Sequence, residues 1–423
     1  MSRPPPSPAA IGAGLAARVI APFAAAYFLS LFFRSINALI APDLVAELSL
    51  GPSDLGFLTA MYFLSFALFQ LPMGALLDRF GARRVQAGLV GIAAAGAMVI
   101  ALGDSLTTVA LGRALVGLGF AGGLMSAYKQ MADWFPAERL PLLNGLFLGF
   151  GSLGAVVATA PAQAMLGIVG WRGLMVAGGI AAAAAAAALW LLVPERSTRA
   201  APAPLGRQVR ELFGVVYRDR LFWRLAPMTV LGFASGSSIQ TLWAGPWLRD
   251  VAGFGRDAVA LQLMVMALAL SIGSALGGVI AEALRRVGIG TLKVAGAAAV
   301  LFMAAELGIV LGWVAGSAAL WAVFGATFNV ITLTYAALSQ HFGPAYAGRA
   351  NAGMNVLSGG GAFALQYAIG AIIGLWPRTA AGGYDPAGYT VAFAILLAMQ
   401  AAAYAWFVLY RPADSRPHSA AVP

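Results

Sequence analysis

Long apolar segments recur along almost the whole of this 423-residue chain and restrict the folds open to it. A helix that crosses a bilayer needs about 20 mostly apolar residues. Only 10% of the residues are charged, against roughly 25% in an average soluble domain. We therefore predict an integral membrane protein made of α-helices. Twelve spans are expected, at about 17–41, 53–77, 84–103, 105–128, 141–167, 172–194, 222–247, 257–282, 292–314, 317–340, 350–376 and 389–410.

The basic residues predict how these spans cross the membrane. Of 26 Lys and Arg residues, two lie within spans, four lie in loops on one side and the remaining 20 lie on the side that carries both termini. Cytoplasmic loops of membrane proteins carry an excess of Lys and Arg. We expect both termini in the cytoplasm and the protein in a bacterial inner membrane. The net charge of +10 is spread over short loops, which argues against a nucleic-acid partner.

A long loop rich in Pro, Arg and Ala divides the twelve spans into two groups of six. The second group resembles the first: a shift of 204 residues pairs Asp78 with Glu282, and a shift of 207 pairs Asn144 with Asn351. Such a duplication predicts two bundles related by a pseudo-twofold axis along the membrane normal. The predicted parts are a disordered cytoplasmic N-terminus (1–16), an N-terminal bundle (17–194), a cytoplasmic linker (195–221), a C-terminal bundle (222–410) and a cytoplasmic tail (411–423).

The stretch GALLDRFGARR, residues 74–84, concentrates charge and glycine between the second and third spans. It closely resembles the signature loop of the major facilitator superfamily, at the position where that family has it. The resemblance extends to the twelve spans, the duplication and the long central loop. It implies that this loop forms a clasp with the facing half of the protein, which favours an outward-open state. The clasp residues would be Gly74, Asp78, Arg79, Gly81 and Arg83. The alternative is that these charges only fix the topology.

Two arginines stand inside predicted spans. Arg113, in LGRALVGLGFAGG, matches the arginine of a second motif of the same family, which implies a place close to the first helix and a role in binding or proton transfer. Arg34 lies on one helical face with Tyr27, Ser30 and Asn37. A buried charge costs at least roughly 2.5–3.5 kcal/mol, so Arg34 is a candidate for binding or coupling. The alternative is that it reaches the outer membrane surface or braces a helix contact.

The repeat partner of the first span is the seventh, and it offers two candidate faces. The shift of 204 places Ser238 and Thr241 opposite Arg34 and Asn37, whereas a second face carries Gly236, Gln240, Trp243 and Trp247. The sequence leaves both faces open, and the two tryptophans also suit an outer aromatic belt. The substrate-binding candidates are Tyr27, Arg34, Asn37, Arg113, Ser238, Gln240, Asn329 and Gln366.

The charges inside the spans are unbalanced. Glu306 is the one acid deep in a span, and Asp43 lies at the outer end of the first. Together with Arg113 these are the candidates for coupling, with a proton or another ion as the coupling partner. Arginine binds carboxylate or phosphate through two parallel hydrogen bonds, so surplus positive charge favours an organic or inorganic anion as the substrate.

We accordingly predict a secondary transporter that moves a small anionic solute by alternating access, as a monomer in the lipid bilayer. The alternatives are a multidrug or metabolite efflux antiporter, and a non-transporting receptor or assembly protein on the same scaffold. The chain has no cysteine, and we find no catalytic constellation, metal-ligand cluster or phosphate-binding loop in the sequence. We therefore expect no enzyme activity, no cofactor and no metal.

Overall fold

The computed structural model describes residues 13–194, 206, 210–380 and 382–410, and these residues form helices and no strands. The predicted tail lies outside this range, as do residues 1–12 of the N-terminus and about half of the linker, namely 195–205 and 207–209. The first group of helices comprises α1 (Ala13–Ser35), α2 (Asn37–Leu48), α3 (Pro52–Phe80), α4 (Ala82–Leu102), α5 (Leu106–Phe120), α6 (Gly123–Trp134), η1 (Ala137–Arg139), α7 (Leu140–Val157) and α8 (Ala160–Leu192).

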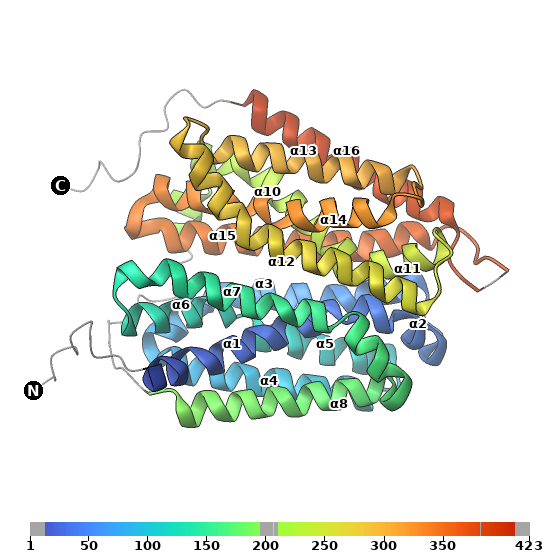
Figure 1. The fold of residues 1–423 in the computed structure, drawn as a ribbon, viewed down its shortest axis with the longest axis horizontal. Helices are drawn as coiled ribbons and strands as arrows, with labels where there is room; N and C mark the ends of the chain where they lie inside the picture. Colours follow the sequence, from blue (N-terminus) through green and yellow to red (C-terminus); the bar gives the residue numbers. More distant parts are fainter. Residues whose placement is uncertain (1–12, 195–205, 207–209, 381, 411–423) are drawn as a thin grey trace, which may run out of the picture.

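The second group follows the central loop. It comprises η2 (Leu212–Val216), α10 (Arg220–Ser238), η3 (Ile239–Trp243), α11 (Ala244–Asp250), α12 (Arg256–Arg286), α13 (Thr291–Val310), α14 (Ser317–Phe328), η4 (Asn329–Leu333), α15 (Thr334–Ile373) and α16 (Pro386–Leu409). Figure 1 shows the two groups as two layers of long helices that lie side by side, blue to green below and yellow to red above. We call them the N-half and the C-half.

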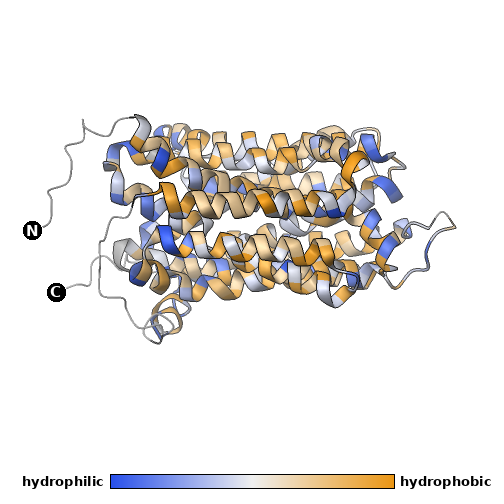
Figure 2. Cartoon of the chain, turned by 90° about the horizontal axis from the view of Figure 1, so that it is seen from below, coloured by the Kyte–Doolittle hydropathy of each residue, from blue (hydrophilic) through white to orange (hydrophobic). Residues whose placement is uncertain are grey.

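Ten helical stretches within the described residues are long and apolar enough to cross a membrane. The other two predicted spans correspond to interrupted helices. Span 141–167 is broken between α7 and α8, and span 222–247 contains the π-helical turn η3. Figure 2 shows apolar residues along the middle of the bundle and hydrophilic residues at its two ends, as a bilayer requires. The chain is therefore a multi-pass membrane protein.

Local sequence explains where the helices begin and end. Asp219 starts α10 by accepting a hydrogen bond from the Phe222 amide at 2.9 Å, and Ser105 caps α5 by accepting one from the Thr108 amide at 3.3 Å. Gly81 separates α3 from α4 with φ at 79°, a left-handed value that glycine adopts without a steric penalty. Glycines with positive φ also interrupt two long helices, where the backbone leaves the helical conformation: α8 at Gly170 and α15 at Gly343.

The two ends of the bundle differ in how the halves meet. We call the end where α1 begins and α16 ends the terminus end, and the opposite end the far end (Figure 1). At the far end Asp43 of the N-half forms a 2.6 Å ion pair with Arg256 of the C-half, and Arg378 donates to the Leu50 carbonyl at 2.6 Å. Glycines bring the backbones close there, with Gly245 against Ala38 and Gly370 against Pro52.

At the terminus end the ion pairs between described residues stay within one half. Asp78 pairs with Lys129 in the N-half, while Asp219 pairs with His341 and Glu211 with Arg349 in the C-half. The halves are thus joined by polar contacts at the far end and, among the residues that the structure describes, by no side-chain ion pair at the terminus end.

Candidate functional site

Arg34 lies near the end of α1, where the two halves meet. Its Nη2 donates to the Ser237 hydroxyl of α10 at 3.1 Å, which is a hydrogen bond between the halves. The side chain is half-buried. No carboxylate of the described residues lies within ion-pair distance of it. A guanidinium carries five N–H donors, so most of its binding capacity remains for a ligand.

Two phenylalanine rings flank this guanidinium, one from each half. The Cζ atom of Arg34 lies 5.8 Å from the centre of the Phe63 ring on α3 and 5.4 Å from that of Phe233 on α10. A cation is attracted to the face of an aromatic ring within about 6 Å. The two rings therefore restrict the position of the Arg34 side chain and surround it with apolar area.

Arg113 fixes the backbone that carries Arg34. It is 1% exposed, and its Nη1 donates to the carbonyl of Phe33, the residue before Arg34, at 3.3 Å. Its Nη2 has no hydrogen-bond partner among the described residues. Arg113 thus lies close to the first helix, as the resemblance to the family motif implies. Arg113 does not reach the surface of the site, so its geometry is that of a residue that positions Arg34.

The seventh predicted span, formed by α10 and η3, lies against α1 through Ser237 and Gln240. Gln240 donates to the Ser35 hydroxyl at 3.0 Å, one residue from Arg34. Gln240 belongs to the second of the two candidate faces of this span, so that face contributes one residue to the contact with α1. Trp243 and Trp247 are 0% and 2% exposed and pack inside the C-half, where Trp243 donates to the Gln366 carbonyl at 3.3 Å. They lie in the protein interior and not in an aromatic belt.

The remaining binding candidates do not all gather around Arg34. Tyr27 stacks on Phe147 within the N-half, with ring centres 4.9 Å apart. Asn329 is half-buried and donates to the Ser274 hydroxyl at 2.7 Å within the C-half. Three others, Asn37, Ser238 and Gln366, are buried, and each carries a side-chain polar atom without a hydrogen-bond partner among the described residues.

Sequence reasoning did not select Ser237, Phe63 or Phe233. Ser237 is 203 residues from Arg34, whereas the repeat offset of 204 pointed to its neighbour Ser238. The π-helical turn η3 follows directly and changes the register of this helix, so a fixed offset cannot give the contact to one residue. Apolar rings carry no sequence signal that separates a binding role from packing.

The acidic candidates lie away from Arg34. Asp43 is held at the far end by Arg256. Glu306 on α13 is 0% exposed and accepts a 2.6 Å hydrogen bond from Gln400 on α16, so it faces the interior of the C-half. The charge at the meeting of the halves is therefore positive among the described residues.

The clasp residues lie at the terminus end. Asp78 forms a 2.7 Å ion pair with Lys129 on α6 of its own half, and not with the C-half. Arg79 stacks on the Phe80 ring at 5.1 Å, and Arg83 on the Trp190 ring at 5.6 Å. Gly81 forms the turn, and Gly74 is half-buried one helical turn before Asp78. A clasp between the halves is thus not engaged in this arrangement, in which the halves meet at the far end.

Comparison with known proteins decides the family. Residues 23–366 match the profile described as Major Facilitator Superfamily. The chain belongs to this superfamily. A solved structure with a similar fold is a bacterial homologue of the human lysosomal transporter Spinster in an inward-facing, unoccupied conformation, with a TM-score of 0.73, 18% identity and coverage of 94% of this chain and 97% of that one.

Curated members of the superfamily with similar sequences are transporters. The probable sulfoacetate transporter SauU of Cupriavidus necator is 24% identical over 60% of this chain and 62% of its own length. The hexuronate transporter of Escherichia coli K12 is 24% identical over 58% of this chain and 60% of its own length. The chain thus spans less than two thirds of the length of these relatives.

Proposed function

We propose that this superfamily member is a secondary transporter of small organic anions, and that Arg34 binds the acidic group of the solute between the two halves. The observation that carries the proposal is the guanidinium of Arg34, which lies at the meeting of the halves, donates a hydrogen bond to Ser237 and has no carboxylate partner in the part of the chain that the structure describes. A bidentate hydrogen bond to a carboxylate or sulfonate would use its remaining donors.

The same geometry would couple binding to movement. The guanidinium is on the N-half, whereas Ser237 and Phe233 are on the C-half. An anion at Arg34 would replace or share the Ser237 contact and would therefore change the interaction between the halves. Rocking of one half against the other around a central site is the alternating-access mechanism of such folds.

The two curated relatives described above support the choice of solute. Their names specify sulfoacetate and hexuronate, which are a sulfonated carboxylate and a sugar acid. We propose that this chain transports a solute of the same class. We further propose that the terminus end faces the cytoplasm of a bacterial cell, because the sequence predicts 20 of the 26 Lys and Arg residues on the side of the two termini. The arrangement described here is then inward-facing.

Uptake into proteoliposomes tests the proposal. Purified protein would be reconstituted, and entry of a radiolabelled hexuronate and of sulfoacetate would be measured with and without an inward pH gradient. Arg34→Gln should reduce uptake roughly 30-fold or more, because removing one partner of a charge pair that the bound solute would bury costs about 2–5 kcal/mol. Arg34→Lys, which keeps the charge and loses the bidentate fork, should keep part of the activity.

The matched control is Arg18→Gln on the same helix, where the side chain is exposed. It should leave uptake unchanged. The proposal fails if Arg34→Gln transports as well as the parent protein, or if a neutral hexose is taken up as fast as the hexuronate. Absence of any flux, together with normal binding, would favour the receptor alternative. A dependence on the pH gradient would identify the proton as the coupling ion.

A further inference from the structure

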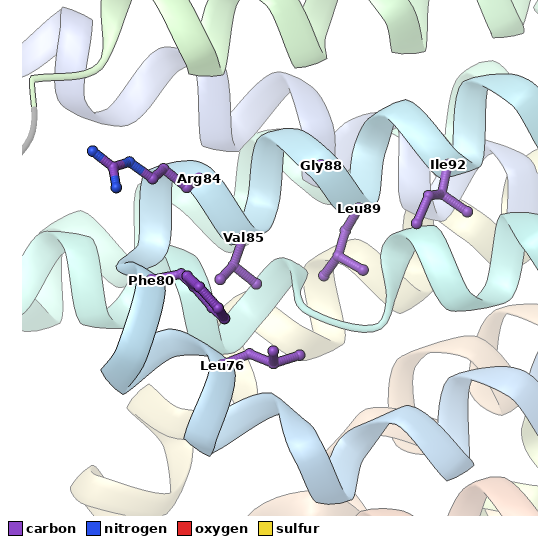
Figure 3. A pocket seen from close by; sticks show the side chains of 7 residues that line it. All are labelled: Leu76, Phe80, Arg84, Val85, Gly88, Leu89 and Ile92. Carbon is purple, nitrogen blue, oxygen red and sulfur yellow. The ribbon is translucent and has the colours of Figure 1, made fainter. Parts of the chain in front are cut away.

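An apolar groove lies between α3 and α4 at the terminus end of the N-half. It has a volume of about 360 Å³, within the range of roughly 300–1,000 Å³ typical of ligand pockets. Figure 3 shows its lining: Leu76 and Phe80 come from α3, and Arg84, Val85, Gly88, Leu89 and Ile92 come from α4. Every lining residue except Arg84 is apolar or glycine, so the groove suits a hydrocarbon chain.

The groove is open at Gly88 of α4, which has no side chain to fill it. A Cβ atom added to Gly88 would meet no atom within 4 Å, and Gly88 is exposed. The groove extends along α4 from Arg84 to Ile92, eight residues or about 12 Å. It therefore runs from the charged end of the bundle into the apolar zone (Figure 2), along the direction of a lipid acyl chain.

Positive charge lies at the mouth of the groove. The guanidinium of Arg84 points away from the row formed by Val85, Leu89 and Ile92 (Figure 3). The guanidinium of Arg79 stacks on Phe80, a lining residue, at 5.1 Å. The nearby carboxylate of Asp78 is paired with Lys129 at 2.7 Å, so its charge is already compensated. The guanidinium groups of Arg79 and Arg84 thus both lie beside the groove, at the charged end of the bundle.

We infer that this groove binds one acyl chain of an anionic phospholipid, with the lipid phosphate against Arg79 and Arg84. Basic residues at the membrane surface attract anionic headgroups. The apolar lining alone would accept any acyl chain, and the two guanidinium groups select the anionic headgroup. By the Lys and Arg distribution, the lipid belongs to the cytoplasmic leaflet. This site is separate from Arg34 and does not depend on the proposed solute.

Native mass spectrometry of the full-length protein in detergent tests the site. The protein would be mixed with phosphatidylglycerol, with phosphatidylcholine of the same acyl chains, or with soluble glycerol phosphate. The parent protein should retain phosphatidylglycerol at least fivefold more than phosphatidylcholine. Glycerol phosphate should neither bind nor displace the lipid, because it has no acyl chain. Equal retention of the two lipids, or displacement by glycerol phosphate, would overturn the inference.

Two kinds of variant separate the groove from its mouth. Gly88→Leu fills the groove and should lower phosphatidylglycerol retention at least fivefold. Gly91→Leu is the matched control, since a Cβ there also meets no atom within 4 Å but Gly91 does not line the groove. It should retain the lipid. Removal of both charges by Arg79→Gln with Arg84→Gln should abolish the preference over phosphatidylcholine, while Arg79→Lys with Arg84→Lys should keep it. Unchanged retention in Gly88→Leu, or an unchanged preference in the double glutamine variant, would refute the site.

Discussion

The close contact at Gly245 predicts how a single methyl group shifts the balance between the two ends of the molecule. A Cβ at position 245 of the C-half would lie 2.2 Å from the Ala38 carbonyl oxygen of the N-half. Non-bonded heavy atoms prefer separations near 3.5 Å, so Gly245→Ala requires the halves to separate by about 1.3 Å at the far end. The obstacle is backbone, which a rotamer change cannot move aside.

The magnitude follows from the cost of overpacking, about 1–3 kcal/mol for an added methyl in a packed contact. That cost applies only while the halves meet at the far end. Since 1.4 kcal/mol corresponds to a factor of ten, the ratio of far-end-closed to far-end-open molecules should fall roughly 5- to 140-fold. We therefore expect Gly245→Ala to populate the outward-facing state.

Double electron–electron resonance would measure this shift, and the absence of native cysteine simplifies the labelling. Spin labels would be attached to Asp104→Cys and Asp257→Cys, which report the distance between the halves at the far end, or to Glu138→Cys and Val287→Cys, which report it at the terminus end. All four residues are exposed. Gly245→Ala should lengthen the far-end distance and shorten the terminus-end distance. Gly278→Ala, where the new methyl meets no atom within 4 Å, should change neither. Identical distributions in Gly245→Ala and the parent would refute the reasoning.

Two other contacts give predictions of their own. Glu306→Ala removes the acceptor of the Gln400 hydrogen bond from a fully buried site, and an unsatisfied buried group costs about 1–3 kcal/mol, so the melting temperature in detergent should fall. Glu306→Gln keeps a hydrogen-bonding partner for Gln400 and should lower the melting temperature less. Equal melting temperatures of the two variants would contradict this. Hydrogen bonds from Trp171 and from Arg172 lower the pKa of Glu47 below its ordinary value of 4.5. The ionised carboxylate therefore stabilises the fold above pH 4.5, and this stabilisation is lost as the pH falls through the lowered pKa. The melting-temperature difference between the parent and Glu47→Gln should therefore be largest at neutral pH and shrink in acid. A difference that grows in acid would contradict a lowered pKa of Glu47.

The sequence predicted the membrane fold well because that signal is repeated over twenty residues at a time. Hydropathy alone gives the long helices such as α4 and α12, and the loop at Gly81 gives the family. It did not give the interruption at η3, where five residues in a π-helical turn leave the hydropathy of the segment unchanged. Span counting from composition is thus more secure than the register of side chains within a span.

The sequence predicted only some of the contacts that the structure shows around Arg34, because the register of side chains within a span is not encoded in hydropathy. Arg34 stood out because a charge inside an apolar helix is costly. Its partner Ser237 did not, because serine is inexpensive in a membrane helix and its neighbour Ser238 looked equivalent. The pairing of Asp78 with Lys129 joins two residues 51 positions apart in the chain, and no local pattern encodes it. The groove beside Arg84 has room at Gly88, and a single glycine in an apolar helix does not reveal a groove in the sequence.

The central claim is that an organic anion binds between the halves at Arg34, and equilibrium binding by isothermal titration calorimetry tests it most directly. Purified parent protein, Arg34→Gln and Arg18→Gln would each be titrated with a hexuronate, with sulfoacetate and with a neutral hexose. The account predicts that the parent and Arg18→Gln bind at least one of the anions and not the hexose, and that Arg34→Gln binds it at least tenfold more weakly. Equal affinity of Arg34→Gln and the parent for that anion would contradict it.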